Sequence, residues 1–121
     1  MRRLLLLLPL ALAGACSDRD ADRAAQLTGG DPARGKEALR TYGCVSCHTI
    51  PGVREADARV GPPLDHLAGR VYLAGVLENS PENLARWIKD PPGVDPKTAM
   101  PNVGVTDEDV RDITSYLYTL K

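Results

Sequence analysis

The segment CVSCH, which spans residues 44–48, constrains this chain more than any other. Two cysteines separated by two residues occur in disulfides, zinc sites, redox-active dithiols and covalent haem-attachment sites. A zinc site normally needs four ligands, whereas the chain has no second cysteine pair and only one further histidine, His66. A thioredoxin-like dithiol would follow a strand, but here a helix is predicted before the pair. Zinc binding and dithiol chemistry are therefore disfavoured.

Covalent haem accounts for every position of the segment. The thiols of Cys44 and Cys47 would each add to one haem vinyl group, and the two residues between them set the spacing of those vinyls. The adjacent His48 would then lie beneath the iron as an axial ligand. Composition agrees, because the chain has no Phe and one Trp with which to build a core. We therefore predict one haem c as the cofactor, with a disulfide or a metal site as the alternative.

Met100 is the predicted sixth ligand of that iron. It is the only methionine besides the initiator, and it lies in DPKTAMPNVG, a loop rich in Pro and Gly between two predicted helices. A thioether opposite imidazole raises the reduction potential and fills the coordination sphere, so the iron would exchange electrons rather than bind oxygen. Core packing is the alternative role for a lone Met. His66 is the competing ligand, but it lies close to His48 in sequence and is expected at the surface.

Helical patterns dominate the rest of the chain, and we predict an all-α domain over residues 29–121. Three segments begin with a capping side chain, which in the first two is followed by Pro at the first helical position. In the last segment apolar residues recur at helical spacing. No alternating stretch is long enough to predict a sheet. The predicted helices are 32–42, capped by Asp31, 81–90, capped by Ser80, and 106–120, which begins at Thr106.

Residues 1–15 have the pattern of an export signal. Arg2 and Arg3 form a basic start, an apolar run covers 4–12, and small residues precede Cys16. The apolar run is shorter than the roughly 20 residues that a transmembrane helix needs. The mature protein is therefore expected to work outside the cytoplasm.

Cys16 is a predicted lipidation site. The segment AGAC, residues 13–16, resembles the lipobox of bacterial lipoproteins, in which the cysteine becomes the N-terminus and carries a diacylglycerol. The alternative is ordinary cleavage after Ala13 or Ala15, which would leave a free thiol. The charged segment 16–28 lacks an apolar period and is predicted to be a flexible tether. The expected location is the periplasmic side of a bacterial membrane, with the protein lipid-anchored or otherwise soluble in the periplasm.

From about residue 30 to residue 120 the chain resembles the class I c-type cytochromes. The segment GDPARGKEALRTYGCVSCHTI is similar to the family's N-terminal helix and haem-attachment motif, and GPPLDHLAGR is similar to its motif Gly-Pro-x-Leu-x-x-x-x-Gly-Arg. NLARWIKDP and the later KTAMP resemble its ligand-loop region. The resemblance implies a small all-α fold in which three main helices and their loops wrap around one covalent haem. It also implies a close crossing of the first and last helices at Gly35, with Tyr116 as its neighbour.

The resemblance implies roles for four further residues. The carbonyl of Pro62 would accept the free N–H of His48 and fix the imidazole tautomer. Arg70 and the hydroxyl of Thr98 would lie near haem propionates. Trp87 would pack beside the haem and the methionine, or serve as an ordinary core residue. The two roles are compatible, because a bound haem would itself be part of the core.

The stretch VYLAGVLENSPENLARWIKDP is also similar to the haem domain fused to subunit II of some bacterial cytochrome oxidases. The dinuclear copper site of that subunit is not expected, because no cysteines remain for it. Docking through a ring of lysines is not expected either. The chain has only Lys36, Lys89, Lys97 and Lys121.

These features predict an electron carrier of a respiratory chain rather than an enzyme that acts on a small-molecule substrate. The expected partners are redox proteins, namely a respiratory complex, a terminal oxidase or a dehydrogenase. The chain has 15 basic and 16 acidic side chains, and loss of the signal makes it more acidic, so no nucleic-acid partner is expected. Three alternatives stay open: an electron-transfer subunit of an oxidoreductase, a peroxidase or gas sensor with an open iron position, and a disulfide-stapled lipoprotein without haem.

Overall fold

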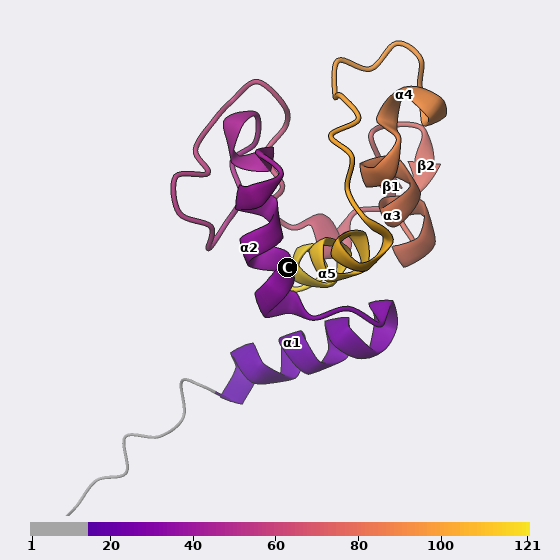
Figure 1. The fold of residues 1–121 in the computed structure, drawn as a ribbon. Helices are drawn as coiled ribbons and strands as arrows, with labels where there is room; N and C mark the ends of the chain where they lie inside the picture. The colour runs from indigo at the N-terminus through magenta and orange to yellow at the C-terminus, as the bar shows by residue number, and fades with distance from the viewer. Residues whose placement is uncertain (1–14) are drawn as a thin grey trace, which may run out of the picture.

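The computed structural model describes the backbone of residues 15–121 and the side chains of residues 18–121. The predicted signal peptide therefore lies outside the described residues except for its last position, and so does the Cys16 side chain. Figure 1 shows the elements in space. They are α1 (Ala15–Thr28), α2 (Pro32–Thr41), the 3₁₀ turns η1 (Cys44–Ser46) and η2 (Leu67–Gly69), the strands β1 (Tyr72–Leu73) and β2 (Leu77–Glu78), and the helices α3 (Pro81–Lys89), α4 (Pro91–Val94) and α5 (Asp107–Leu117).

The three predicted helices are present as α2, α3 and α5, and each is capped by the predicted side chain. The Asp31 carboxylate accepts hydrogen bonds from two N–H groups in the first turn of α2. Ser80 and Thr106 each accept one from the first turn of α3 and of α5. The one sheet in the described residues is the antiparallel pair β1–β2, in which Tyr72 faces Glu78. The prediction of an all-α fold is confirmed.

The helices α2 and α5 cross at a distance that only glycine permits. A Cβ atom on Gly35 would lie 1.8 Å from the carbonyl oxygen of Asp112, so any other residue would force the helices apart. The predicted crossing at Gly35 is confirmed, but its nearest neighbours are backbone atoms of Asp112 and the next residue, not Tyr116. The Tyr116 side chain reaches a different loop, where its hydroxyl donates to the carbonyl of Pro51 at 2.6 Å.

Asp112 holds this crossing together. Its side chain is buried and accepts hydrogen bonds of 2.8 and 3.2 Å from the Arg34 guanidinium and of 2.7 Å from the backbone N–H of Asp31. Burial disfavours the Asp112 anion, but the hydrogen bonds from Arg34 and Asp31 outweigh that penalty, so the pKa of Asp112 lies below its usual value. The ionised carboxylate thus ties α2, and the residue before it, to α5.

The helix α1 corrects the prediction of a flexible tether over residues 16–28. The segment is helical and packs on α5, along the lower edge of the molecule in Figure 1. Of its described side chains only that of Ala24 is buried, and Gly29 ends the helix in the left-handed conformation at φ +70°. An ion pair joins Lys121 to Asp20 in α1. The sequence pattern failed to predict this helix because one small buried residue leaves no apolar stripe.

The hydrophobic core lies between α2, α3 and α5. Leu39, Leu84 and Ile113, one from each helix, are among its least exposed residues. Ile113 and Leu117 belong to the apolar stripe that predicted α5. All four side chains also border the cavity described below, so one side of the core faces that space.

The proline that was predicted to end the second helix has a second role. Pro91 follows α3 and begins the short helix α4, whose cap is the Asp90 carboxylate. Within residues 15–121, no helix combines the length and the apolar character needed to cross a membrane.

Candidate functional site

A cavity of about 470 Å³ lies between the two arms of the fold. In Figure 1 one arm holds α2 and the residues that follow it, the other holds α3, α4 and the loop before α5, and α5 lies between them. The side chains that line the cavity are mostly apolar, and they come from all three main helices. They include Leu39, Leu84, Trp87, Ile88, Ile113 and Leu117.

The two cysteines occupy one tight turn in the cavity wall. Gly43 leaves α2 in the left-handed conformation, at φ +75°, and starts η1. The carbonyl of Cys44 then accepts the backbone N–H of His48 at 3.0 Å. Burial raises the pKa of the Cys44 thiol, in keeping with an apolar wall. Both Cys44 and Cys47, together with the imidazole, are thus presented to the cavity by one short piece of backbone.

His48 is oriented by a backbone carbonyl. Its Nδ1 lies 2.6 Å from the oxygen of Pro62. Because a carbonyl can only accept, Nδ1 carries the hydrogen and Nε2 keeps its lone pair. This is the contact that the family resemblance implies. The imidazole is therefore held in the tautomer that can bind a metal through Nε2.

Gly61 is a site residue that the sequence analysis missed. A Cβ at this position would lie 2.5 Å from Cε1 of His48 and 2.9 Å from its Nδ1. The Gly61 N–H donates to the carbonyl of Cys47 at 2.7 Å, so this backbone runs directly against the imidazole. The sequence feature that could have indicated this residue is its position just before Pro62 in GPPLDHLAGR. From sequence alone, however, a glycine required for space cannot be told from one required for a turn.

Met100 lines the same cavity from the loop before α5. Local hydrogen bonds shape that loop: Thr98 Oγ1 accepts the N–H of Met100 at 3.1 Å, and the carbonyl of Asp95 accepts the N–H of Thr98 at 3.0 Å. His66 does not line the cavity, and its side chain is 75% exposed beside Asp65. The structure therefore brings Met100 and His48 to one space and leaves His66 outside it.

The three other residues singled out by the family resemblance, Arg70, Trp87 and Thr98, also line the cavity. One nitrogen of the Arg70 guanidinium donates to the carbonyls of Pro63 and Asp65, at 2.6 and 2.8 Å, which fixes the head group. Trp87 lies half-buried on α3. Thr98 accepts a hydrogen bond through its hydroxyl oxygen, and the hydroxyl hydrogen stays available to a further acceptor.

The donors in this cavity fit a covalent haem. Two thiols on one turn, an imidazole nitrogen with a free lone pair and a thioether all border one apolar space. Among the described side chains, no three from His, Cys, Asp and Glu gather to form a site for a bare metal ion.

Comparison with known proteins gives a family and several relatives. The sequence model of the Cytochrome c family matches residues 32–121, a range that leaves α1 outside. Over 96 residues the chain is 35% identical to cytochrome c oxidase subunit 2 of Bacillus sp. (strain PS3), a match that covers 75% of this chain and 27% of the relative.

Two further relatives have the same name. Cytochrome c oxidase subunit 2 of Alkalihalophilus pseudofirmus is 33% identical over 89 residues, which cover 73% of this chain and 25% of the relative. The protein of Bacillus subtilis (strain 168) is 33% identical over 92 residues, which cover 73% of this chain and 26% of the relative. The chain thus spans about a quarter of the length of the relatives it matches.

Proposed function

The chain belongs to the cytochrome c family, and from this premise we propose that it carries single electrons in a respiratory chain, at the periplasmic side of a bacterial membrane. Haem c is covalently attached in this family, and Cys44 and Cys47 supply the two thiols. When bound, the haem supplies a reversible one-electron change of its iron between Fe(II) and Fe(III). The observation that carries the proposal is the single apolar cavity shared by both thiols, His48 and Met100.

In this proposal His48 and Met100 would hold the haem iron. Pro62 supports the assignment because its carbonyl keeps the hydrogen on Nδ1 of His48 and leaves Nε2 for the iron. The soft sulfur of Met100 favours the ferrous state and so raises the reduction potential. If both side chains hold the iron as proposed, oxygen or peroxide would have no free position on it, which would disfavour a peroxidase or a gas sensor.

Three side chains complete the proposed site. Arg70, whose head group is held by two carbonyls and which lines the cavity, would supply a positive charge to a haem propionate. The hydroxyl hydrogen of Thr98 would donate to a propionate while its oxygen holds the N–H of Met100. Trp87 would shield the Met100 side from water. Together these residues keep the site dry and balance the charges of the propionates.

The proposed partners are redox proteins. A small, weak contact suits a carrier that must dock and leave at each turnover. A second candidate function is that of an electron-transfer subunit in an oxidoreductase complex, such as a terminal oxidase or a dehydrogenase, because the relatives are named as oxidase subunits. Purification from native membranes distinguishes the two: a subunit copurifies with its complex at constant ratio, and a carrier does not.

Replacing Met100 tests the proposal. In Met100→Ala the haem should stay attached through Cys44 and Cys47, because the thioethers are unaffected. The reduction potential should fall by about 0.2 V, a fraction of the roughly 0.8 V over which axial ligands set haem potentials. The sulfur-to-iron charge-transfer band should be lost, and carbon monoxide should bind if the position stays open. Redox titration and optical spectra of the purified protein measure these changes.

The matched control is His66→Ala. Because this side chain lies outside the cavity, its loss should leave the band and the potential nearly unchanged. If His66→Ala lowers the potential and removes the native spectrum while Met100→Ala does neither, the iron is ligated by two histidines and Met100 is only packing.

The proposed location depends on Cys16. Residues 1–15 act as the signal peptide in this proposal, and Cys16 carries the lipid that holds the haem domain at the membrane. Cys16→Ala should move the protein from the membrane fraction to the soluble fraction, with no change in the haem spectrum. Mass spectrometry of the mature N-terminus is the second measurement. An unmodified N-terminus on a wholly soluble wild-type protein would exclude the lipid.

A further inference from the structure

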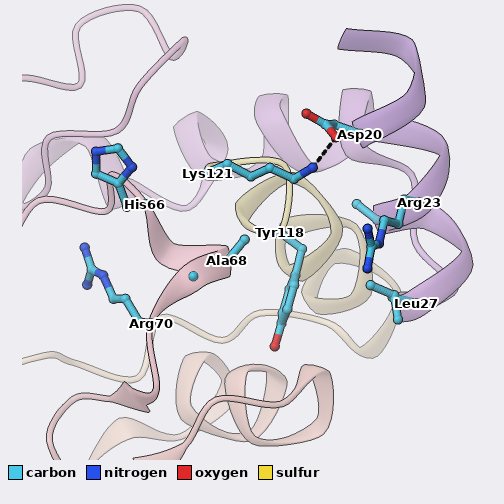
Figure 2. Close-up of a pocket in the computed structure, with 10 residues that line it drawn as sticks. Asp20, Arg23, Leu27, His66, Ala68, Arg70, Tyr118 and Lys121 are labelled. Atoms are coloured by element: carbon cyan, nitrogen blue, oxygen red, sulfur yellow. Dashed lines mark hydrogen bonds and ion pairs between the residues drawn. The ribbon is translucent and has the colours of Figure 1, made fainter. Parts of the chain in front are cut away.

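A second pocket, of about 540 Å³, lies between α1, η2 and the end of the chain (Figure 2). Arg23 and Leu27 form its α1 side, Ala68 of η2 lies opposite, and Tyr118 and Lys121 follow α5. We call it the basic pocket. Its α1 side precedes residue 32, where the match to the family begins, so the pocket is built partly from a segment that the family match does not cover.

The charges around the basic pocket are mainly positive. Arg23, Arg70 and Lys121 carry permanent positive charge, and Asp20 is the one acidic side chain among the lining residues, which also include His66. Arg70 is paired with Asp65 at 3.6 Å. Asp20 is paired with Lys121, as the dashed line in Figure 2 shows. None of the ion pairs in the described part of the chain includes Arg23. Among the three permanent cations that line the pocket, Arg23 is therefore the one outside these ion pairs, in a protein of net charge −1.

The wall of the basic pocket is apolar between those charges. Leu27 is 55% exposed and contributes apolar surface to this wall. The ring of Tyr118 forms another part of the wall, and its hydroxyl donates to Asn79 Oδ1 at 2.7 Å. Asn79 in turn donates to the carbonyl of Arg70 at 2.9 Å. The ring is thereby fixed against the segment that carries Arg70.

We propose that the basic pocket binds an organic anion, a phosphate or carboxylate group attached to an apolar body. Arg23 supplies a guanidinium that can form a forked hydrogen bond with such a group, and its charge is not taken up by any of the ion pairs in the described residues. Leu27 and the Tyr118 ring receive the apolar body. A pocket of this size, mostly apolar with a few convergent polar groups, is typical of small-molecule sites.

Arg70 links the basic pocket to the haem cavity, because it lines both. An anion bound beside this guanidinium would add negative charge at the border of the haem cavity, and with haem bound it would favour Fe(III) over Fe(II). By thermodynamic linkage, the ferric protein then binds the anion more tightly than the ferrous protein by the same factor. This linkage rests on the proposed function, whereas binding itself does not.

The test uses 1-naphthyl phosphate as the probe, titrated by calorimetry into the complete haem-loaded protein in each oxidation state. We expect saturable binding with a single site, and about threefold tighter binding to the ferric form. Threefold corresponds to a fall in reduction potential of about 28 mV on saturation, at 59 mV per tenfold for one electron. Neutral 1-naphthol should bind at least tenfold more weakly than the phosphate.

Three variants locate the site. Arg23→Ala, which keeps a good helix former in α1, should weaken 1-naphthyl phosphate binding at least tenfold. The control Arg86→Ala removes the same charge from an exposed position on α3 that lines neither cavity, and should change the affinity less than twofold. Leu27→Ala should weaken 1-naphthyl phosphate several-fold but leave inorganic phosphate unaffected.

Several outcomes would overturn the proposal. Absence of saturable binding, or equal losses in Arg23→Ala and Arg86→Ala, would exclude the pocket as an anion site. Equal affinity for 1-naphthol would exclude recognition of the charged group. Equal affinities of the ferric and ferrous forms would exclude the linkage through Arg70 but would leave the anion site itself standing. The optical spectrum and reversible reduction, recorded in the same samples without probe, show separately whether the proposed electron-carrier function holds.

Discussion

The helix α5 takes part in two regions of different construction, its crossing with α2 and the wall of the haem cavity. At the crossing, backbone lies against backbone, because Gly35 has no side chain and Asp112 receives all its hydrogen bonds from protein atoms. At the cavity wall, Ile113 and Leu117 face the space that belongs to the cofactor. The protein completes the first region alone, whereas the second is complete only with haem. The two regions should therefore respond differently to loss of the haem and to changes in packing.

Loss of the haem should have the largest effect. In the haem-free form of the double variant Cys44→Ala/Cys47→Ala, the core between α2, α3 and α5 keeps an apolar wall open to water. We expect the cooperative transition to disappear, a loss comparable to the roughly 5–15 kcal/mol by which domains are stable. Amide hydrogen exchange should show the remaining protection at the α2–α5 crossing and none in α3. If the amides of α2, α3 and α5 were equally protected in the haem-free form, the proposed difference between the crossing and the cavity wall would be wrong.

Filling the crossing should have the next largest effect. In haem-loaded Gly35→Ala, the new methyl group meets the carbonyl oxygen of Asp112 and the helices must separate. We expect the free energy of unfolding in urea to fall by about 3 kcal/mol. Gly69→Ala is the control, because a Cβ there has no neighbour within 4 Å, and it should change stability by less than about 0.5 kcal/mol. Equal effects of the two substitutions would mean that the crossing can widen freely.

Replacing the buried carboxylate should have a smaller effect. Asp112→Asn keeps the shape but removes the charge that receives the Arg34 and Asp31 donors. We expect a loss of about 2 kcal/mol near pH 7, measured as the urea midpoint of the haem-loaded protein. The control is Asp107→Asn, which removes an exposed carboxylate that is paired with Lys89. It should lower the free energy of unfolding much less than Asp112→Asn does.

The pH dependence of that loss follows from the lowered pKa of Asp112. A carboxylate with a lowered pKa in the folded state stabilises the protein above its unfolded value of about 3.9, and this contribution disappears as the pH falls through the folded value. The stability difference between wild type and Asp112→Asn should therefore be full near neutral pH and shrink below about pH 4. A difference that grows with acidification would contradict the assignment.

Much of the fold could be predicted because its signals are local. Asp31, Ser80 and Thr106 mark helix starts through hydrogen bonds within one turn, which a sequence pattern records directly. The helix α1 could not be predicted in this way, since it is stabilised by packing on α5 and by an ion pair with the distant Lys121. Both contacts join residues that are far apart in sequence.

In the candidate site, too, some residues could be predicted from the sequence, whereas others depend on contacts that only the folded chain makes. Residue chemistry and count pointed to the thiols, His48 and Met100, because few alternatives exist in the chain. The requirement for Gly61 was missed, because it depends on where the imidazole ring lies in space. Arg70 was linked to the haem by resemblance, but only the folded chain shows that it also borders a second pocket.

If Cys16 carries a lipid as proposed, the packing of α1 would limit how far the haem domain can travel from the membrane. A helix of 14 residues is about 21 Å long, whereas the same segment fully extended would reach about 48 Å. With Cys16 acylated as proposed, an extended leash would let the domain sample partners at many heights above the lipid surface. A helix packed on α5 and paired through Asp20 to Lys121 removes that slack, so the domain and its anchor diffuse as one body. In that case encounters would depend on lateral diffusion, and the domain would favour partners whose redox centre stands at its own height.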